Sequence, residues 1–169
     1  MARTKAKSRK SGIEPKALRP NMTGYGVPKS EDGMLPWDWA QERLGRSHNY
    51  WITTVRPDAS PHTMVVWGVW IEGAWYFSTS AISRKSRNLE QNSRCIICNE
   101  NAQEAVILEG VARRLRPSRI PPQASKVYKE KYSWDLNPNQ GPVWQVRPKI
   151  VFAMPEKLFP KGVTKWVFE

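Results

Sequence analysis

One segment, residues 83 to 89, holds the side chains best suited to chemistry. Its sequence, Ser-Arg-Lys-Ser-Arg-Asn-Leu, places hydroxyls, cations and an amide where a predicted strand, Ala74 to Thr79, gives way to a predicted helix. A helix that begins there adds free backbone N–H groups and a favourable dipole for an anion. Arginine offers a planar fork to a phosphate, and lysine offers a compact point charge. Taken alone, the segment fits either a phosphate clamp or a basic helix start in solvent.

The rest of the chain is poor in side chains that do catalysis by themselves. It has two histidines, His48 and His62, and no Cys, His and Asp cluster with metal-ligand spacing, so no metal site is expected. Neither a G-x-S-x-G elbow, a P-loop nor a G-x-G-x-x-G motif is present. Such a chain suits a bound redox cofactor, because the cofactor then supplies the chemistry and the protein supplies position and electrostatics. The pattern assigns no catalytic residue.

The elements that must position residues 83 to 89 are three strands joined by tight turns. Tyr50 to Arg56 is rich in β-branched and aromatic residues, and Pro57 to Ser60 has turn chemistry. Thr63 to Ile71 alternates with apolar side chains on both faces, which predicts one strand sandwiched between layers. Glu72-Gly73 then turns the chain into Ala74 to Thr79.

The remaining chain predicts more strands and two more helices. Helices are expected at Pro36 to Ser47 and Pro122 to Tyr132, and Gly110 marks a bulge or a close backbone approach. Further strands are expected at Arg94 to Asn99, Ala105 to Leu115, Val143 to Val146, Lys149 to Met154 and Val163 to Phe168. About seven strands with a few short helices favour an antiparallel barrel, which removes exposed sheet edges.

Several short segments, in this order and spacing, resemble the pyridoxamine 5′-phosphate oxidase-like split-barrel superfamily. They are Val55-Arg56-Pro57-Asp58, Pro61-His62, Val66-Trp67, Tyr76-Phe77-Ser78-Thr79 and Ser83-Arg84-Lys85-x-x-Asn88-Leu89. The resemblance covers about residues 35 to 168. It implies a mainly β fold, a six- to seven-stranded antiparallel split β-barrel with a few short helices. It also implies FMN or the deazaflavin coenzyme (8-hydroxy-5-deazaflavin type) as cofactor, because the superfamily holds FMN-dependent oxidases and deazaflavin-dependent reductases.

The resemblance also implies roles for individual residues. It implies that Ser83, Arg84 and Lys85 bind the cofactor phosphate and that Asn88 braces their turn. The resemblance implies that the cofactor ring lies along the backbone of Met64, Val65, Val66 and Trp67. It also implies that Ser78 and Thr79 contact the ribityl chain or the phosphate. Trp166 resembles the tryptophan of an Arg-Trp-x-Phe ending that approaches the ring, although a place in the core fits it equally well. The superfamily further implies a C₂ homodimer with the substrate stacked over the ring between subunits.

The sequence departs from the family pattern at three places, and the third of them bears on which substrate is expected. Ala59 stands where the first hairpin usually has glycine, and Val66 stands where proline is common. The Arg-x-Arg-Leu-x-Pro ending of true pyridoxamine-phosphate oxidases is replaced by Val163 to Trp166. This replacement argues against a vitamin B6 phosphate as substrate and leaves FMN and deazaflavin both open.

Length and charge predict one basic domain with a tail. The 169 residues carry a net charge of +12, of which +7 falls on residues 1 to 30, so the remaining 139 are only mildly basic. We expect residues 1–30 to be a basic, largely flexible tail, either solvated or bound nonspecifically to RNA, or a strap over the partner subunit through Met22 to Gly26. Residues 31–169 are expected to form the split-barrel domain.

The sequence also allows predictions about the compartment of the protein and about the chemistry of its two cysteines. Without an apolar stretch of about 18 residues or an apolar leader, neither a membrane span nor a secretory signal is expected, and cytoplasm is the default. Cys95 and Cys98 have C-x-x-C spacing, but they fall in a strand, where positions i and i+3 face opposite sides. We interpret them as structural thiols.

Three functions remain in competition. The first is an FMN- or deazaflavin-dependent oxidoreductase that transfers hydride to a small organic substrate. The second is a non-catalytic binder of FMN, heme or another planar ligand. The third is a basic nucleic-acid-binding barrel, which would need exposed aromatic residues along a basic groove.

Overall fold

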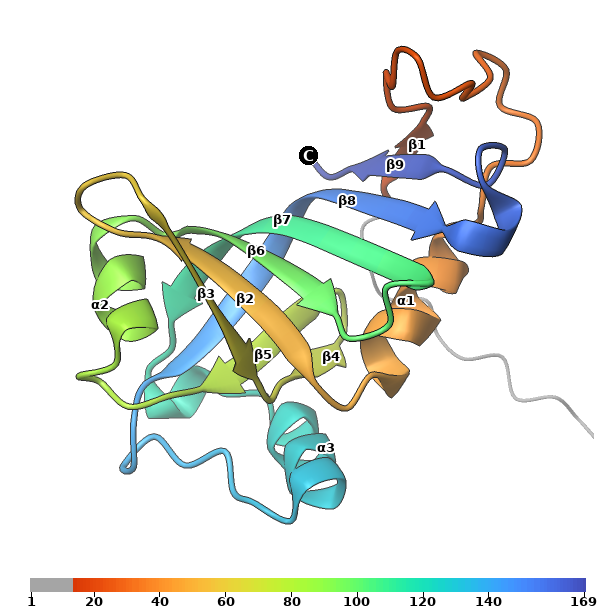
Figure 1. Cartoon of the computed structure of the whole chain (residues 1–169). Helices are drawn as coiled ribbons and strands as arrows, with labels where there is room; N and C mark the ends of the chain where they lie inside the picture. Colours follow the sequence, from red (N-terminus) through yellow and green to blue (C-terminus); the bar gives the residue numbers. More distant parts are fainter. Residues whose placement is uncertain (1–13) are drawn as a thin grey trace, which may run out of the picture.

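The computed structural model describes residues 14–169, in which nine strands form one antiparallel sheet with three α-helices against it (Figure 1). The helices are α1 (Trp37–Arg46), α2 (Arg84–Gln91) and α3 (Pro122–Tyr132), with short 3₁₀ turns η1 (Pro117–Arg119) and η2 (Glu156–Leu158). The strands are β1 (Lys16–Leu18), β2 (Tyr50–Val55), β3 (Pro61–Val66), β4 (Val69–Ile71), β5 (Ala74–Ser78), β6 (Arg94–Asn99), β7 (Glu104–Arg114), β8 (Val143–Pro155) and β9 (Thr164–Val167).

The sheet runs in the order β1-β9-β8-β7-β6-β2-β3, and β5 pairs with both β8 and β4. The predicted mainly β, antiparallel fold is therefore confirmed, with nine strands in place of six or seven. Among the described residues, no helix is long and apolar enough to cross a membrane.

The predicted strand Thr63 to Ile71 is wrong as a single element, because it divides into β3 and β4. A Cβ atom at Gly68 would lie 2.1 Å from the Trp75 ring, so the backbone passes there only as glycine. The Gly68 N–H donates to the Tyr132 hydroxyl (3.0 Å) and so finds its partner outside the ladder. The predicted sandwiching also fails for β3, since it is the last strand of the sheet and Met64 and Val65 are exposed.

Two predicted strands at the end of the chain are one, because β8 runs unbroken through Arg147 and Pro148. The register between β7 and β8 shifts at Gly110, which pairs with Pro148 and leaves Lys149 as an extra residue. A bulge of this kind tolerates proline, since one ladder position is unpaired there. The predicted close approach at Gly110 is confirmed, because a Cβ atom there would lie 2.6 Å from the Arg147 carbonyl oxygen.

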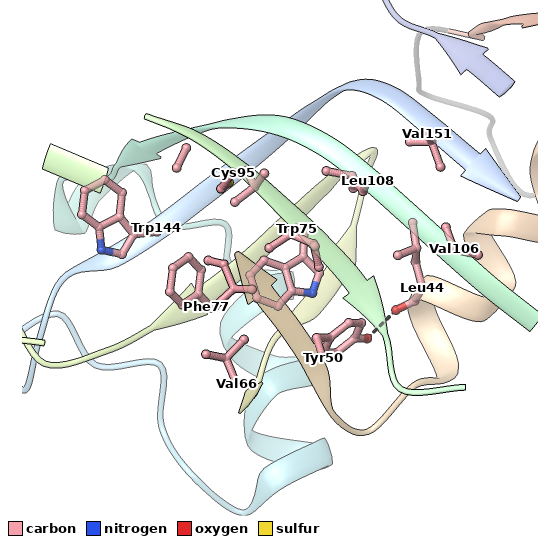
Figure 2. Close-up of a cluster of buried hydrophobic side chains, with 14 of the residues drawn as sticks. Leu44, Tyr50, Val66, Trp75, Phe77, Cys95, Val106, Leu108, Trp144 and Val151 are labelled. Atoms are coloured by element: carbon pink, nitrogen blue, oxygen red, sulfur yellow. Dashed lines mark hydrogen bonds between the residues drawn. The ribbon is translucent and has the colours of Figure 1, made fainter. Parts of the chain in front are cut away.

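The core lies on the inner face of the sheet around Trp75, which packs between Tyr50 and Phe77 (Figure 2). The predicted helix at residues 36–47 is confirmed as α1, and its buried Leu44 accepts a hydrogen bond from the Tyr50 hydroxyl through its carbonyl. Cys95 is part of this core, and burial raises the pKa of its thiol to about 12. A buried, poorly ionised thiol is consistent with the structural role we expected.

Part of the predicted tail is ordered against the domain. β1 pairs with β9, and the Arg19 guanidinium donates to the carbonyl oxygens of Ser30 (2.7 Å) and Val163 (2.6 Å). Residues 14–30 therefore include an edge strand that the breakers in the sequence concealed. The rest of the predicted tail, residues 1–13, lies outside the described residues.

Candidate functional site

The predicted clamp lies at a corner where β5 ends and α2 begins. Ser83 is the N-cap of α2, and its Oγ accepts from the Ser86 N–H (3.2 Å). The Thr79 hydroxyl, one residue beyond β5, donates to the same Ser83 oxygen (3.2 Å). Two hydroxyls thus meet at the first turn of a helix, where backbone N–H groups point outward.

Asn88 holds this helix to the sheet. Its side chain is 1% exposed, and its Nδ2 donates to the Thr54 hydroxyl on β2 (2.9 Å). Its Oδ1 and the Ser86 hydroxyl are buried without a partner among the described residues. Asn88 therefore links α2 to β2, and its predicted place at the cofactor site stays a prediction.

Four cationic or titratable side chains gather at the corner. Arg84 is exposed and Lys85 is half-buried at the start of α2, and burial lowers the pKa of Lys85. The β2–β3 hairpin lies over α2 (Figure 1) and brings Arg56 and His62 to the same place. We call Arg56, His62, Arg84 and Lys85 the cationic corner.

The surroundings of His62 at this corner favour its neutral form. Burial, followed by the positive charges of Arg56, Lys85 and Arg84, lowers its pKa below the usual value. Its Nδ1 is buried and has no hydrogen-bond partner among residues 14–169. The Arg56 guanidinium is held at the hairpin turn, donating to the Ser60 hydroxyl (3.2 Å) and the Pro61 carbonyl (2.6 Å).

Sequence reasoning did not assign Arg56 and His62 to the site. The signal that could have found them is the hairpin register, which pairs His62 with Thr54, the residue that Asn88 contacts from α2. That pairing depends on the turn, which the Asp58 carboxylate closes by accepting from the Ser60 N–H (3.0 Å).

The inner side of β3 opens toward the cationic corner. By register, His62, Met64 and Val66 share the face of the buried residues Thr54, Ile52 and Tyr50. Val66 is only 8% exposed, whereas Met64 is 47% exposed, because β3 is the last strand of the sheet among residues 14–169. Alternate backbone groups of this edge strand lack a strand partner. A flat apolar floor with free backbone polar groups therefore lies beside the cations.

An aromatic wall ends this floor. Trp67 follows β3 with 42% of its side chain exposed, and its ring stacks on Tyr132 at 4.9 Å and 9°. The Tyr132 hydroxyl oxygen lies 2.7 Å from the carbonyl oxygens of both His48 and Gly68, which share its single proton, and these contacts fix the ring. Next to it, burial lowers the pKa of Lys131 to about 8. Of the predicted ring-binding run, Met64, Val66 and Trp67 line this side, while the Val65 side chain faces the outer side.

Trp166 is not brought to the corner. It is fully buried on β9 and packs edge-on against Trp37 at 5.3 Å. β9 lies far from α2 (Figure 1), so within one chain Trp166 is a core residue, the alternative that the sequence left open, and its place beside the cofactor stays a prediction. Ser78, by contrast, ends β5 beside Thr79 and is half-buried. Among residues 14–169, no group of three His, Cys, Asp or Glu side chains is placed to hold a metal ion.

The outer face of the sheet is apolar, and its central row is half-buried or exposed in the described part of the chain. The register aligns Val65, Trp51, Cys98, Ile107 and Phe152 across five strands. Trp51 is 47% and Val65 46% exposed. α1 and α2 pack on the opposite face, where Leu44 accepts from Tyr50 and Asn88 donates to Thr54.

Comparison with solved structures finds the same fold in proteins of several kinds. An F420 reductase is 20% identical, with a TM-score of 0.54, over 66% of this chain and 94% of that one. A heme binding protein from Mycobacterium smegmatis is 18% identical (TM-score 0.59), over 71% of this chain and 55% of that one. HutZ, a heme storage protein from Vibrio cholerae, is 20% identical (TM-score 0.55), over 69% of this chain and 89% of that one.

A search of curated proteins found no match. The family model described as pyridoxamine 5′-phosphate oxidase matches residues 37–154, which is most of the chain and includes the cationic corner. The chain therefore belongs to the pyridoxamine 5′-phosphate oxidase family.

Proposed function

We propose that the chain is an FMN- or deazaflavin-dependent oxidoreductase that transfers hydride to a small organic substrate at a site between two subunits. The observation that carries the proposal is the cationic corner beside the open inner side of β3. Cations and hydroxyls suit a phosphate, and the exposed Met64 with its free strand edge suits a flat ring that has a polar rim. The similarity in fold to an F420 reductase adds support.

The residues fit the two parts of such a cofactor. Arg84 and Lys85 pair with the phosphate, and the hydroxyls of Thr79 and Ser83 supply neutral hydrogen bonds beside them. A bound flavin or deazaflavin supplies hydride transfer, while this chain binds it, orients it and excludes water.

A second copy of the chain completes the site in this proposal. The outer row formed by Val65, Trp51, Cys98, Ile107 and Phe152 offers the apolar surface that an isologous C₂ interface needs. β3 belongs to both surfaces, since its inner side floors the cofactor site and Val65 is part of the outer row. Dimer formation would therefore place the partner subunit next to the ring.

A second candidate is a binder of heme or another planar ligand without turnover. Two proteins of this fold are a heme binding protein and a heme storage protein. The neutral His62 at the corner is the kind of imidazole that ligates iron. Nucleic-acid binding is the least supported function, because the exposed Trp51 lies in the apolar outer row instead of a basic groove.

Ligand identification separates these candidates. The absorption spectrum of the purified chain, with mass spectrometry of what it releases, is expected to show a flavin or a deazaflavin. A heme Soret band would favour the second candidate. A chain that carries no planar ligand, and that binds neither FMN, deazaflavin nor heme in titration, contradicts both.

A further inference from the structure

A second basic site lies at the end of β7. A concavity of about 350 Å³ is lined by Arg113, Arg114, Leu115, Arg116 and Arg119, and we call it the arginine pocket. It is separate from the cationic corner, because Arg114 pairs with Glu90 near the C-terminal end of α2 (3.3 Å). The corner is at the other end of that helix, about 12 Å away for eight residues.

Buried structure holds part of this pocket in place. Arg113 donates to Gln145 Oε1 (3.3 Å), and Gln145 is 8% exposed and donates to the Tyr76 hydroxyl (2.8 Å). The Leu115 N–H donates to the Val143 carbonyl (2.9 Å), which fixes the chain where β7 ends.

The turn η1 brings the other two arginines together. The Arg119 N–H donates to the Arg116 carbonyl (2.8 Å), so both residues belong to one tight turn. The pocket therefore has two arginines from the end of the sheet and two from the turn that follows it.

The charges in the pocket are unbalanced. Four arginine residues line it, none of the lining residues is acidic, and Glu90 pairs with only one of them, Arg114. Within residues 14–169, Arg116 and Arg119 make neither an ion pair nor a side-chain hydrogen bond. A multiply charged anion would relieve this repulsion, and guanidinium forks match phosphate oxygens in geometry. The volume is at the small end of ligand sites, about 300–1,000 Å³, and exceeds what a single phosphate fills.

We propose that the arginine pocket binds the pyrophosphate group of a small molecule, either a nucleotide or dinucleotide or free pyrophosphate. Two adjacent phosphates present more oxygens to these arginines than a single phosphate does, and they fill more of the concavity. The proposal does not depend on what the cationic corner binds.

Calorimetric titration of the full chain with inorganic pyrophosphate tests this. We expect saturable binding that is tighter than the binding of inorganic phosphate and weaker at high salt. The variant Arg116→Gln/Arg119→Gln should weaken pyrophosphate binding about tenfold or more, since two charged hydrogen-bonding groups are lost. The matched control, Lys157→Gln/Lys161→Gln, removes the same charge around η2 and should bind as the unaltered chain does.

Further titrations place the anion and identify its source. Lys85→Ala should retain pyrophosphate binding, and loss of binding there would assign the anion to the corner and overturn the proposal. Competition by ADP or by a nicotinamide dinucleotide distinguishes a nucleotide from free pyrophosphate. Absence of saturable pyrophosphate binding in the unaltered chain also overturns it.

Discussion

The two faces of the central strands differ in how they are closed. The inner face of β2, β6 and β7 carries Tyr50, Ile97 and Leu108, which are fully buried. The outer face of the same strands carries Trp51, Cys98 and Ile107, which are equally apolar but half-buried or exposed. Successive residues of the same strand therefore lie on opposite faces, one in the buried core and the next on a partly exposed apolar surface.

The exposed apolar area is small on the inner face and extended on the outer face, and this difference indicates a different binding partner for each. The inner face opens only at β3, where Met64 is exposed beside the cationic corner, and an opening of that size suits a ligand. The outer face is apolar across five strands, and a surface of that extent suits a second copy of the chain. This difference agrees with the proposal that the cofactor binds on one face and the partner subunit on the other.

The largest expected effect is at the closed inner face. Leu108→Ala should lower the free energy of unfolding by about 2–5 kcal/mol, because it leaves a cavity in a packed core. Urea unfolding measures this. The matched control, Ile107→Ala on the outer side of the same strand, should cost clearly less in dilute, monomeric protein. Equal losses would show that the two faces are not different.

The outer face should govern assembly more than folding. Trp51→Arg places a charge in the outer row, so we expect a monomer whose circular dichroism is unchanged. Analytical ultracentrifugation measures the mass. Trp134→Arg changes an exposed tryptophan beyond α3 and should leave the dimer intact. A dimer that survives Trp51→Arg would rule out this face as the interface.

The smallest effect concerns the closed end of the inner face. Lys131 Nζ donates to the Tyr50 hydroxyl (3.0 Å) and the Gly68 carbonyl (3.2 Å), and burial lowers its pKa from 10.5 to about 8. Between these values the unfolded chain binds more protons than the folded one, so this group makes stability rise with pH from about 8 to 10.5.

Lys131→Met should remove that rise, as measured by urea midpoints across the window. The control Lys129→Met alters an exposed lysine of the same helix and should retain the pH dependence of the unaltered chain. An identical pH dependence in Lys131→Met would mean that the ammonium group is not desolvated in the fold.

Most elements were predictable because their patterns are local. β2, β5, β6 and the three helices carry their own periodicity and breakers, and Ser83 with its neighbours marks the clamp directly. What failed depends on distant residues. Gly68 breaks the predicted strand because Trp75 lies against it, and Pro148 fits inside β8 because it pairs with Gly110 at the bulge. Arg56 and His62 were missed because they reach the corner only through the hairpin register.

The most direct test of the cationic corner is the affinity for FMN and for the deazaflavin coenzyme in the unaltered chain and in Lys85→Ala. Fluorescence titration should show binding weakened by about 1–3 kcal/mol in the variant, the contribution of a charged hydrogen bond. Lys157→Ala, which removes an exposed cation around η2, should bind as the unaltered chain does. Unchanged affinity in Lys85→Ala for whichever cofactor the chain binds would contradict the assignment of the phosphate to this corner.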